Sequence, residues 1–287
     1  MNGILLVDKP VGISSQGAIS VIKRALGVKK IGHAGTLDPL ASGVLVVLVN
    51  NATKLSDYLL EKEKTYLAEV TIGKSTDTLD REGNVTETKK VTEILDVDSA
   101  LKSMLGKSKQ IPPMYSALKK DGKKLYELAR NGETIEREAR DIEIYEISRT
   151  SEIVLENDEL KFSFITRASK GTYIRTLCFD IGAKLNFPAY MSNLVRVSSG
   201  KFKIEDCYSL EDIKNGKYKL ISMIDAIDFI PRVIANEKIY KLVMNGHKLP
   251  IELVNSNEAK IAICYNDELI GIYEKQENIY KALRIWN

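Results

Sequence analysis

The chain has 287 residues, of which 44% are hydrophobic, and its 42 basic and 39 acidic side chains give a net charge of +3. This length and apolar content suit one large domain, or a large and a small one, and exclude a wholly disordered chain. The charge is too small to indicate nucleic-acid binding by itself. The longest apolar run, Val44 to Val49, is far shorter than the ~18 to 20 residues of a membrane span, and the N-terminus shows no secretory signal. We therefore expect a cytoplasmic protein with no membrane partner.

The cysteines and histidines do not form a metal-binding pattern. Cys178, Cys207 and Cys264 are widely spread without a CxxC pair, and His33 and His247 lie far apart. A structural zinc site needs four such ligands in close pairs. We expect no metal and three reduced, mostly buried thiols.

Apolar patterns predict the elements of the first part of the chain. In chain order they are a strand at 3–7, a helix from Ser14 or Ser15 to Leu26, a loop over 29–43, a strand at 44–49, a helix at 53–61, a strand at 65–72 and a helix at 98–105. Gly27 ends the first helix. In the strand at 65–72, Tyr66, Ala68 and Val70 fall on one side, as in a half-buried strand.

The middle of the chain contains a polar insertion between regular elements. Residues 112–141 combine Pro112-Pro113, many lysines and a helical stretch at 124–131. Strands at 142–149 and 160–167 and a helix at 173–185 follow. Strands and helices alternate irregularly without a βαβ repeat, which predicts an α+β fold with a central mixed or antiparallel sheet flanked by helices.

The pattern changes near Ile230-Pro231-Arg232. A helix at 237–245 and short strands at 251–254, 260–265 and 269–273 resemble a compact β-rich module. We predict a boundary there, giving domains 1–231 and 232–287.

The most informative stretch is the loop Gly32-His33-Ala34-Gly35-Thr36-Leu37-Asp38-Pro39-Leu40-Ala41-Ser42-Gly43. Its three glycines permit backbone conformations closed to other residues, and Pro39 favours an extended Asp38. An aspartate in such a loop is commonly a turn former, and the loop residues alone leave that interpretation open. The GxxxxGK[ST] pattern of a phosphate-binding loop is absent.

This loop resembles the GHxGxLDP signature of the TruB pseudouridine synthases, and further blocks match the same family in order. These are GILLVDKP at 3–10, the K-x-Y at Lys64 to Tyr66, Thr76-Asp77-Thr78 with Asp80 and Gly83, PPMYSALK at 112–119, and SKGTYIRT at 169–176. The resemblance covers at least residues 3–200. It implies a pseudouridine-synthase catalytic domain in which Asp38 is the catalytic residue.

The resemblance implies an isomerase that acts on uridine in the T loop of tRNA, at position 55, without a metal or organic cofactor. Pseudouridylation breaks the N-glycosidic bond, rotates the freed uracil and rejoins it to the ribose through C5. Cleavage places oxocarbenium-like charge on the sugar, which an ionised carboxylate stabilises or traps, as in glycoside hydrolysis. Whether Asp38 attacks the sugar C1′ or the base C6, or assists elimination to a glycal, stays open.

The resemblance also assigns roles to other residues. Arg175 is similar to the family arginine that pairs with the aspartate, and Tyr66 to the tyrosine that stacks on the target base and is proposed to assist proton removal from C5. His33 resembles a histidine that fills the space left by the flipped base. The remaining expected substrate contacts are the pocket residues Tyr173 and Leu194 and the structural or RNA-positioning residues Lys9 and Asp77. At Leu194 the run Asn193-Leu194-Val195-Arg196 departs from the family's leucine-arginine-arginine.

RNA binding is expected from two further segments. The insertion at 112–141, with Lys119, Lys120, Lys123 and Lys124, is similar to a family segment that folds over the RNA stem-loop. The tail from 232 resembles a shortened PUA module, a small RNA-binding domain. The expected partner is the T-arm stem-loop of tRNA, and we expect a monomer. Flipping the target base out of the folded loop costs a few kcal/mol.

Two other functions compete with this interpretation. One is a non-catalytic chaperone that unfolds and refolds tRNA through the same groove. The other is the catalytic subunit of a guide-RNA complex, which shares the aspartate loop. Intact Asp38, Tyr66 and Arg175 oppose a purely structural role, and the long insertion is typical of the stand-alone bacterial enzymes.

Overall fold

The computed structural model describes residues 1–116, 118–120 and 122–286. Its largest sheet runs in the order β1-β3-β13-β4-β12-β10-β7, with β2 paired to β3, β11 to β12 and β14 to β13. The strands are β1 (Gly3–Lys9), β2 (Ile31–Ala34), β3 (Ser42–Val49), β4 (Lys64–Ile72), β7 (Gly106–Gln110), β10 (Arg140–Arg149), β11 (Val154–Glu156), β12 (Glu159–Ala168), β13 (Ala189–Ser199) and β14 (Phe202–Lys203). Neighbours are antiparallel except β13 and β3, which run parallel. The sheet is mixed, which confirms the expected α+β class.

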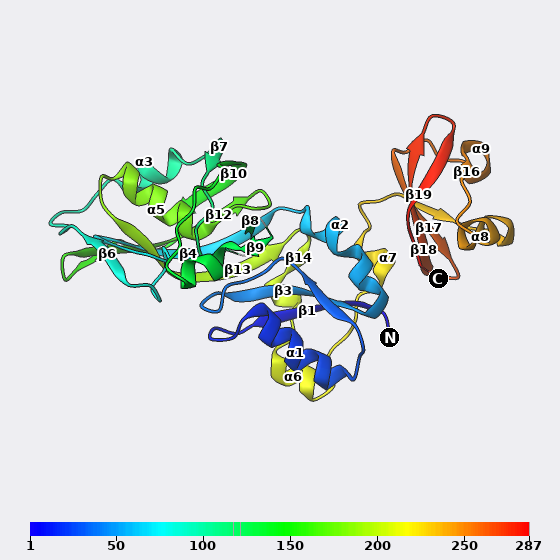
Figure 1. The fold of residues 1–287 in the computed structure, drawn as a ribbon, viewed down its shortest axis with the longest axis horizontal. Helices are drawn as coiled ribbons and strands as arrows, with labels where there is room; N and C mark the ends of the chain where they lie inside the picture. Colours follow the sequence, from blue (N-terminus) through cyan, green and yellow to red (C-terminus); the bar gives the residue numbers. More distant parts are fainter. Residues whose placement is uncertain (117, 121, 287) are drawn as a thin grey trace.

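Short helices and two small hairpins surround this sheet (Figure 1). The helices are α1 (Ser15–Leu26), α2 (Ser56–Leu60), α3 (Val97–Lys102), α4 (Leu125–Arg130), α5 (Ile174–Lys184), α6 (Leu210–Lys214) and α7 (Met223–Ala226), with 3-10 turns η1 (Asn50–Leu55) and η2 (Ile204–Asp206). The hairpins are β5 (Lys74–Thr76) with β6 (Val85–Thr88), and β8 (Lys119–Lys120) with β9 (Lys123–Lys124).

The first strand and helix form as their residues predict. The Ser14 side chain accepts a hydrogen bond from the Gly17 N–H, and Gly27 ends α1 in the left-handed conformation. Helix α1 covers one face of β1, whereas the C-terminal part of the chain covers the other. Both faces of β1 and β3 are therefore buried, which explains why their sequences are continuously apolar rather than alternating.

Strand β4 lies in the middle of the sheet. Tyr66, Ala68 and Val70 are buried on one face, and Leu177 and Ile181 of α5 pack in the same apolar cluster. The predicted alternation of this strand is therefore confirmed.

Strand β13 joins the two halves of the sheet, and no pattern in its residues predicted it. It pairs with β4 on one side and with β3 on the other. Its pairing with β4 shifts register between Met191 and Asn193 and again between Arg196 and Ser198. Each bulge interrupts the two-residue period of side chains, so the strand lacks the alternation that would reveal it.

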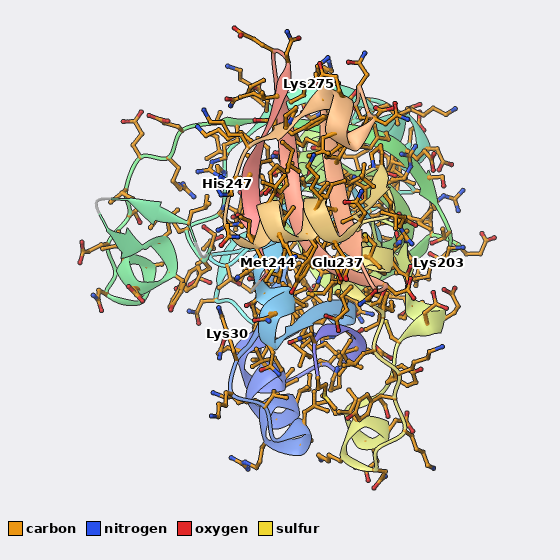
Figure 2. All side chains as sticks on the ribbon, turned by 90° about the vertical axis from the view of Figure 1, so that its right-hand side faces the viewer. Lys30, Lys203, Glu237, Met244, His247 and Lys275 are labelled. Carbon is orange, nitrogen blue, oxygen red and sulfur yellow. The ribbon has the colours of Figure 1, made fainter. Side chains whose placement is uncertain are left out.

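The end of the chain forms a second, five-stranded sheet in the order β15-β17-β18-β19-β16. Its elements are β15 (Arg232–Ile234), α8 (Glu237–Met244), β16 (Leu249–Pro250), α9 (Ile251–Val254), β17 (Lys260–Tyr265), β18 (Glu268–Gln276) and β19 (Ile279–Ile285). The strand expected at 251–254 is wrong, because Pro250 opens a helical turn there and Asn255 closes it in the left-handed conformation. Figure 2 looks onto this sheet, with Glu237, Met244 and His247 marking the region of α8. The domain boundary at 231 stays a prediction.

Hydrogen bonds and apolar contacts hold the second sheet against the first part of the chain. The Trp286 Nε1 donates a hydrogen bond to the Asn51 carbonyl at 3.0 Å, and the Lys54 Nζ donates one to the Ile285 carbonyl at 2.9 Å. Apolar side chains of β1, β3 and β17 also share one cluster. None of the helices in the described ranges is long and apolar enough to cross a membrane.

Candidate active site

The loop between β2 and β3 presents Asp38 at the surface of a buried cluster. Leu37 and Leu40 are 3% and 1% exposed, whereas the Asp38 side chain is 38% exposed. Leu37 and Leu40 pack among the buried residues of β4 and α5. Apolar side chains on both sides of the aspartate therefore fix its direction, which a simple surface turn would not require.

Two side chains from the start of the chain also hold this loop. The Ser15 Oγ donates to the Leu37 carbonyl and accepts from the Leu37 N–H, both at 2.8 Å. The fully buried Lys9 Nζ donates to the carbonyls of Pro10, Ile13 and Pro39 at 2.9, 2.7 and 3.4 Å. Lys9 therefore lies behind the loop and contacts main-chain carbonyls. Burial lowers the pKa of Lys9 to about 8, although the Asp38 charge opposes that shift.

Arg175 on α5 lies directly against Asp38. Its Nη2 is 3.0 Å from the Asp38 Oδ2, and its side chain is 5% exposed. It also donates hydrogen bonds to the carbonyls of Thr78 at 3.1 Å and Tyr115 at 2.6 Å. One guanidinium therefore contacts the aspartate loop, the β5–β6 turn and the start of the insertion.

Asp80, the second carboxylate beside Arg175, matches a family block in the sequence, but that match assigned it no role. Its Oδ2 lies 3.6 Å from the Arg175 Nη1, and its side chain is 8% exposed. The Thr78 hydroxyl and the Glu82 N–H donate hydrogen bonds to its Oδ1 at 2.6 and 3.1 Å. Asp80 belongs to the same polar run as Asp77, but the spacing of the two residues did not show which carboxylate points inward.

Competing influences act on the Asp38 carboxyl. Burial raises its pKa above the usual value, and the neighbouring Asp80 charge adds to that increase. The charges of Arg175 and Lys9 lower it, and so does the hydrogen bond from Arg175. Arg175 is therefore the main group that opposes the rise in the pKa of this partly buried carboxyl.

Aromatic and apolar residues border this carboxylate. Tyr66 and Leu194 are 9% and 6% exposed and belong to the same cluster as Leu37. Tyr173 directly precedes α5, where the Gln110 side chain accepts from its N–H at 2.8 Å and donates to its carbonyl at 3.1 Å. Burial raises the pKa of the Tyr173 phenol, which stays neutral at physiological pH.

His33 and Asp77 have different surroundings from Tyr66, Leu194 and Tyr173. His33 is half-buried on β2, and its Nδ1 has no hydrogen-bond partner in the described residues. Burial, and then the charge of Arg196, lowers its pKa, so the ring is neutral. The exposed Asp77 instead stabilises the β5–β6 turn, accepting from the Asn84 N–H at 2.9 Å and from the Asn84 Nδ2 at 3.1 Å.

This geometry agrees with the family to which the sequence matches. Residues 23–174 match the N-terminal domain of the TruB family pseudouridylate synthases, and residues 175–228 match the C-terminal domain of tRNA pseudouridylate synthase B. The chain belongs to the TruB family of pseudouridylate synthases. It is therefore an isomerase of the pseudouridine-synthase class.

Relatives support this membership along the whole chain. A tRNA pseudouridine synthase B of Bacillus licheniformis is 49% identical over 254 residues, covering 85% of this chain and 82% of the relative. One from Bacillus subtilis is 44% identical over 255 residues, covering 86% and 82%. One from Streptococcus sanguinis is 40% identical over 294 residues and covers both chains completely.

Solved structures show the same fold at lower identity. A chain in a Cbf5-Nop10-Gar1 complex has a TM-score of 0.72 and 24% identity, covering 99% of this chain and 84% of its own. A chain in an H/ACA RNP bound to a substrate RNA containing 2′-deoxyuridine also has a TM-score of 0.72, with 22% identity, covering 99% and 85%. These similarities establish the pseudouridine-synthase fold.

The structure brings together a carboxylate on a fixed loop, a buried arginine and, around Leu37, an apolar cluster. Within the part of the chain that the structure describes, no group of three or more His, Cys, Asp or Glu side chains is arranged to hold a metal ion. A carboxylate of this kind can stabilise positive charge on a sugar or form a bond to it.

Proposed function

We propose that this pseudouridine synthase isomerises one uridine in the T loop of tRNA, at position 55, with Asp38 as its nucleophile. The observation that carries the proposal is the contact of Asp38 with the buried Arg175, 3.0 Å between Oδ2 and Nη2, on a fold shared by the TruB family. The relatives named tRNA pseudouridine synthase B are 40 to 49% identical to this chain, which supports tRNA as the substrate.

The reaction exchanges one bond to the ribose for another. The bond between C1′ and N1 breaks, while Asp38 stabilises the positive charge on the sugar or forms a bond with it. The uracil rotates, C5 bonds to C1′, C5 loses its proton and N1 gains one. The substrate therefore supplies every heavy atom of the product, while the C5 proton leaves to solvent and N1 takes a proton from solvent. Any bond between Asp38 and C1′ breaks when C5 bonds to C1′, and no oxidant or cofactor is needed.

The surrounding residues have separate tasks in this scheme. Arg175 keeps Asp38 ionised and directed toward the sugar. Tyr66 stacks on the flipped base and assists removal of the C5 proton, and Tyr173 and Leu194 form the apolar wall of the pocket. The neutral His33 fills the space that the base leaves. An apolar wall suits a reaction in which water must not capture the freed sugar.

Two further segments are proposed to bind the rest of the tRNA. Residues 112–141 would close over the T-arm, and residues 232–287 would act as a shortened PUA-like RNA-binding domain. Figure 2 shows the segment that contains α4 standing out from the body of the molecule. Ala117 and the side chains of Lys119, Lys120, Lys123 and Lys124 lie outside the described part of the structure. We further propose a cytoplasmic monomer.

Tritium release from transcripts labelled at uracil C5 tests this proposal. Wild-type enzyme is expected to release one tritium per tRNA, and none from a transcript with cytidine at position 55. Asp38→Asn should lower the rate by about 10⁴-fold or more while tRNA binding persists, because it removes the nucleophile at nearly constant volume. Asp158→Asn is the matched control, since Asp158 lies in an exposed turn and pairs with Lys90.

Each other outcome has a distinct meaning. Tight tRNA binding without release by either protein would favour the RNA chaperone. Equal release from wild type and Asp38→Asn would refute the assignment of the carboxylate. Continued full release from the transcript with cytidine at position 55 would refute the proposed target uridine.

A further inference from the structure

Arg196 on β13 is the largest side chain in the structure that is fully buried, at 1% exposed. A buried cation loses its hydration and is stable only when its N–H groups find strong acceptors. The Arg196 Nε donates to the Val44 carbonyl at 2.8 Å. Its Nη2 and Nη1 donate to the carbonyls of Gly35 at 3.0 Å and Thr36 at 3.4 Å. The three hydrogen bonds described for this guanidinium all end on main-chain oxygens.

These three carbonyls flank the Asp38 loop on both sides. Gly35 and Thr36 lie just before Leu37, and Val44 lies just after Gly43, where β3 is already regular. One rigid, planar group therefore joins the two ends of the loop and holds them at a fixed separation. Lys9 and Ser15 contact the interior of the loop, at Pro39 and Leu37. Arg196 therefore holds the two ends of the loop, whereas Lys9 and Ser15 hold its interior.

The main chain of Arg196 links the same loop to the strand of Tyr66. Arg196 pairs with Gly43 in the parallel register of β13 and β3, and with Tyr66 in the antiparallel register of β13 and β4. Gly43 has a φ of 98°, and a Cβ at that position would lie 2.3 Å from the Arg196 carbonyl oxygen. The register of β13 and β4 shifts directly after Arg196, a local irregularity of the kind that redirects side chains near active sites.

We propose that Arg196 is a positioning residue that holds the Asp38 loop and the strand of Tyr66 in one geometry. Its guanidinium sets the shape of the loop, and its backbone sets the place of that loop relative to Tyr66. A guanidinium is required at this position because only it has N–H donors on three nitrogens that can reach carbonyls on both sides of the loop. This inference rests on the proposed function, in which Asp38 and Tyr66 act on the same nucleotide.

The first test separates turnover from binding. Arg196→Met keeps most of the volume but removes the hydrogen bonds and the charge. We expect kcat for tritium release to fall about 100-fold, the cost of misplacing reacting groups by roughly 1 Å, with the Kd for tRNA changed by less than about threefold. Arg196→Lys keeps the charge but cannot donate hydrogen bonds to both ends of the loop, so its kcat should fall about tenfold. Arg149→Met is the matched control, because Arg149 lies on β10 and pairs with Asp98.

The second test does not depend on turnover. The chain has two histidines, and His247 is exposed. Arg196 is the charged side chain that acts on His33 in the described structure, where burial contributes more to lowering the pKa and a Gly35 hydrogen bond opposes it. In NMR titrations, the His33 pKa should rise in Arg196→Met and remain near its wild-type value in Arg196→Lys.

The outcomes are decisive in either direction. A folded Arg196→Met with wild-type kcat would overturn the inference, and so would parallel losses of kcat and tRNA affinity with an unchanged His33 titration. If Arg196→Met does not fold, Arg196→Lys supplies the kinetic comparison. If wild-type enzyme releases no tritium, the proposed function fails. In that case an unchanged His33 titration in Arg196→Met would also overturn the placement of the Arg196 guanidinium against the Asp38 loop.

Discussion

Two regions of the molecule meet at Arg175 and are held in place differently. The Asp38 loop is fixed from behind by the buried side chains of Leu37, Leu40 and Lys9. The segment 112–141 packs instead around a small apolar cluster of its own, made by Met114, Leu125 and Leu128. One contact between this segment and the body is the hydrogen bond from Arg175 to the Tyr115 carbonyl.

The difference matches the roles proposed for the two regions. A catalytic carboxylate must be held within a fraction of an ångström, which requires buried neighbours with fixed rotamers. A segment that closes over a substrate must open and close at low cost, and such segments have few buried contacts. Arg175, on α5, contacts both regions, at Asp38 and at the Tyr115 carbonyl.

Among the changes that test this comparison, the largest effect is expected from breaking the contact that the two regions share. Arg175→Met removes the charge beside Asp38 and leaves the buried Asp80 without its cation. We expect kcat to fall by roughly 10³-fold, which corresponds to about 4 kcal/mol of lost transition-state stabilisation. The measurement is single-turnover tritium release at saturating enzyme.

The pH dependence of the same variant gives a second check. Activity needs ionised Asp38, so the acidic side of the pH–rate profile follows the pKa of this group. Burial already raises that pKa, and Arg175 opposes the increase. In Arg175→Lys, which keeps a less well-placed charge, the acidic side should move to higher pH. A profile that stays in place or moves to lower pH would contradict the role given to Arg175.

The sequence predicted the Asp38 loop well but could not predict what lies behind it. Gly, Pro and Asp in the loop are local signals, and the family motif added a function to them. Asp80 and Arg196 were not singled out, because their roles depend on which residues the sheet brings together across more than 90 positions. An aspartate in a polar turn and an arginine in a strand have no local signature that distinguishes a buried site from a surface one.

The same reason explains the errors in the fold. Helix α1 and strand β4 carry their own periodicity, and strands β1 and β3 are continuous apolar runs, so their positions were predicted. Strand β13 is interrupted by two register shifts, and α9 is a single helical turn over four residues that are apolar enough to resemble a strand. Short elements at bends are decided by tertiary packing and by φ angles, which hydrophobic patterns do not report.

A smaller effect is expected when only the loop side of the comparison is altered. The pKa of Lys9 in the folded protein is about 8, below its ordinary 10.5, because burial outweighs the favourable Asp38 charge. Between these values the unfolded chain binds a proton that the folded chain has released, so the free energy of unfolding rises with pH. Over the whole interval this amounts to about 3 kcal/mol.

Lys9→Met removes that dependence. Urea unfolding from pH 7 to 10.5 should show wild-type protein gaining stability relative to the variant as the pH rises. Lys64→Met is the matched control, since burial also lowers the pKa of Lys64 to about 8 but Lys64 bonds to the carbonyls of Leu60 and Lys62, away from the Asp38 loop. Wild-type protein should gain stability with rising pH relative to both variants, whereas only Lys9→Met should also lower kcat, by about tenfold. A stability difference that is constant with pH would refute the assignment for Lys9.

The smallest expected effect concerns the insertion alone. Leu125 is 3% exposed in the cluster with Met114 and Leu128. Leu125→Ala leaves a cavity there, because so small a cluster has few side chains that could move in to fill the space. If the segment grips RNA, loosening it should raise the Kd for tRNA by about tenfold, while turnover at saturating tRNA and the melting of the main body change little. Leu105→Ala is the matched control, because Leu105 is 48% exposed. If Leu125→Ala instead lowered kcat at saturation as strongly as Lys9→Met, the insertion would be part of the rigid catalytic framework, and the contrast between a fixed loop and a closing segment would no longer hold.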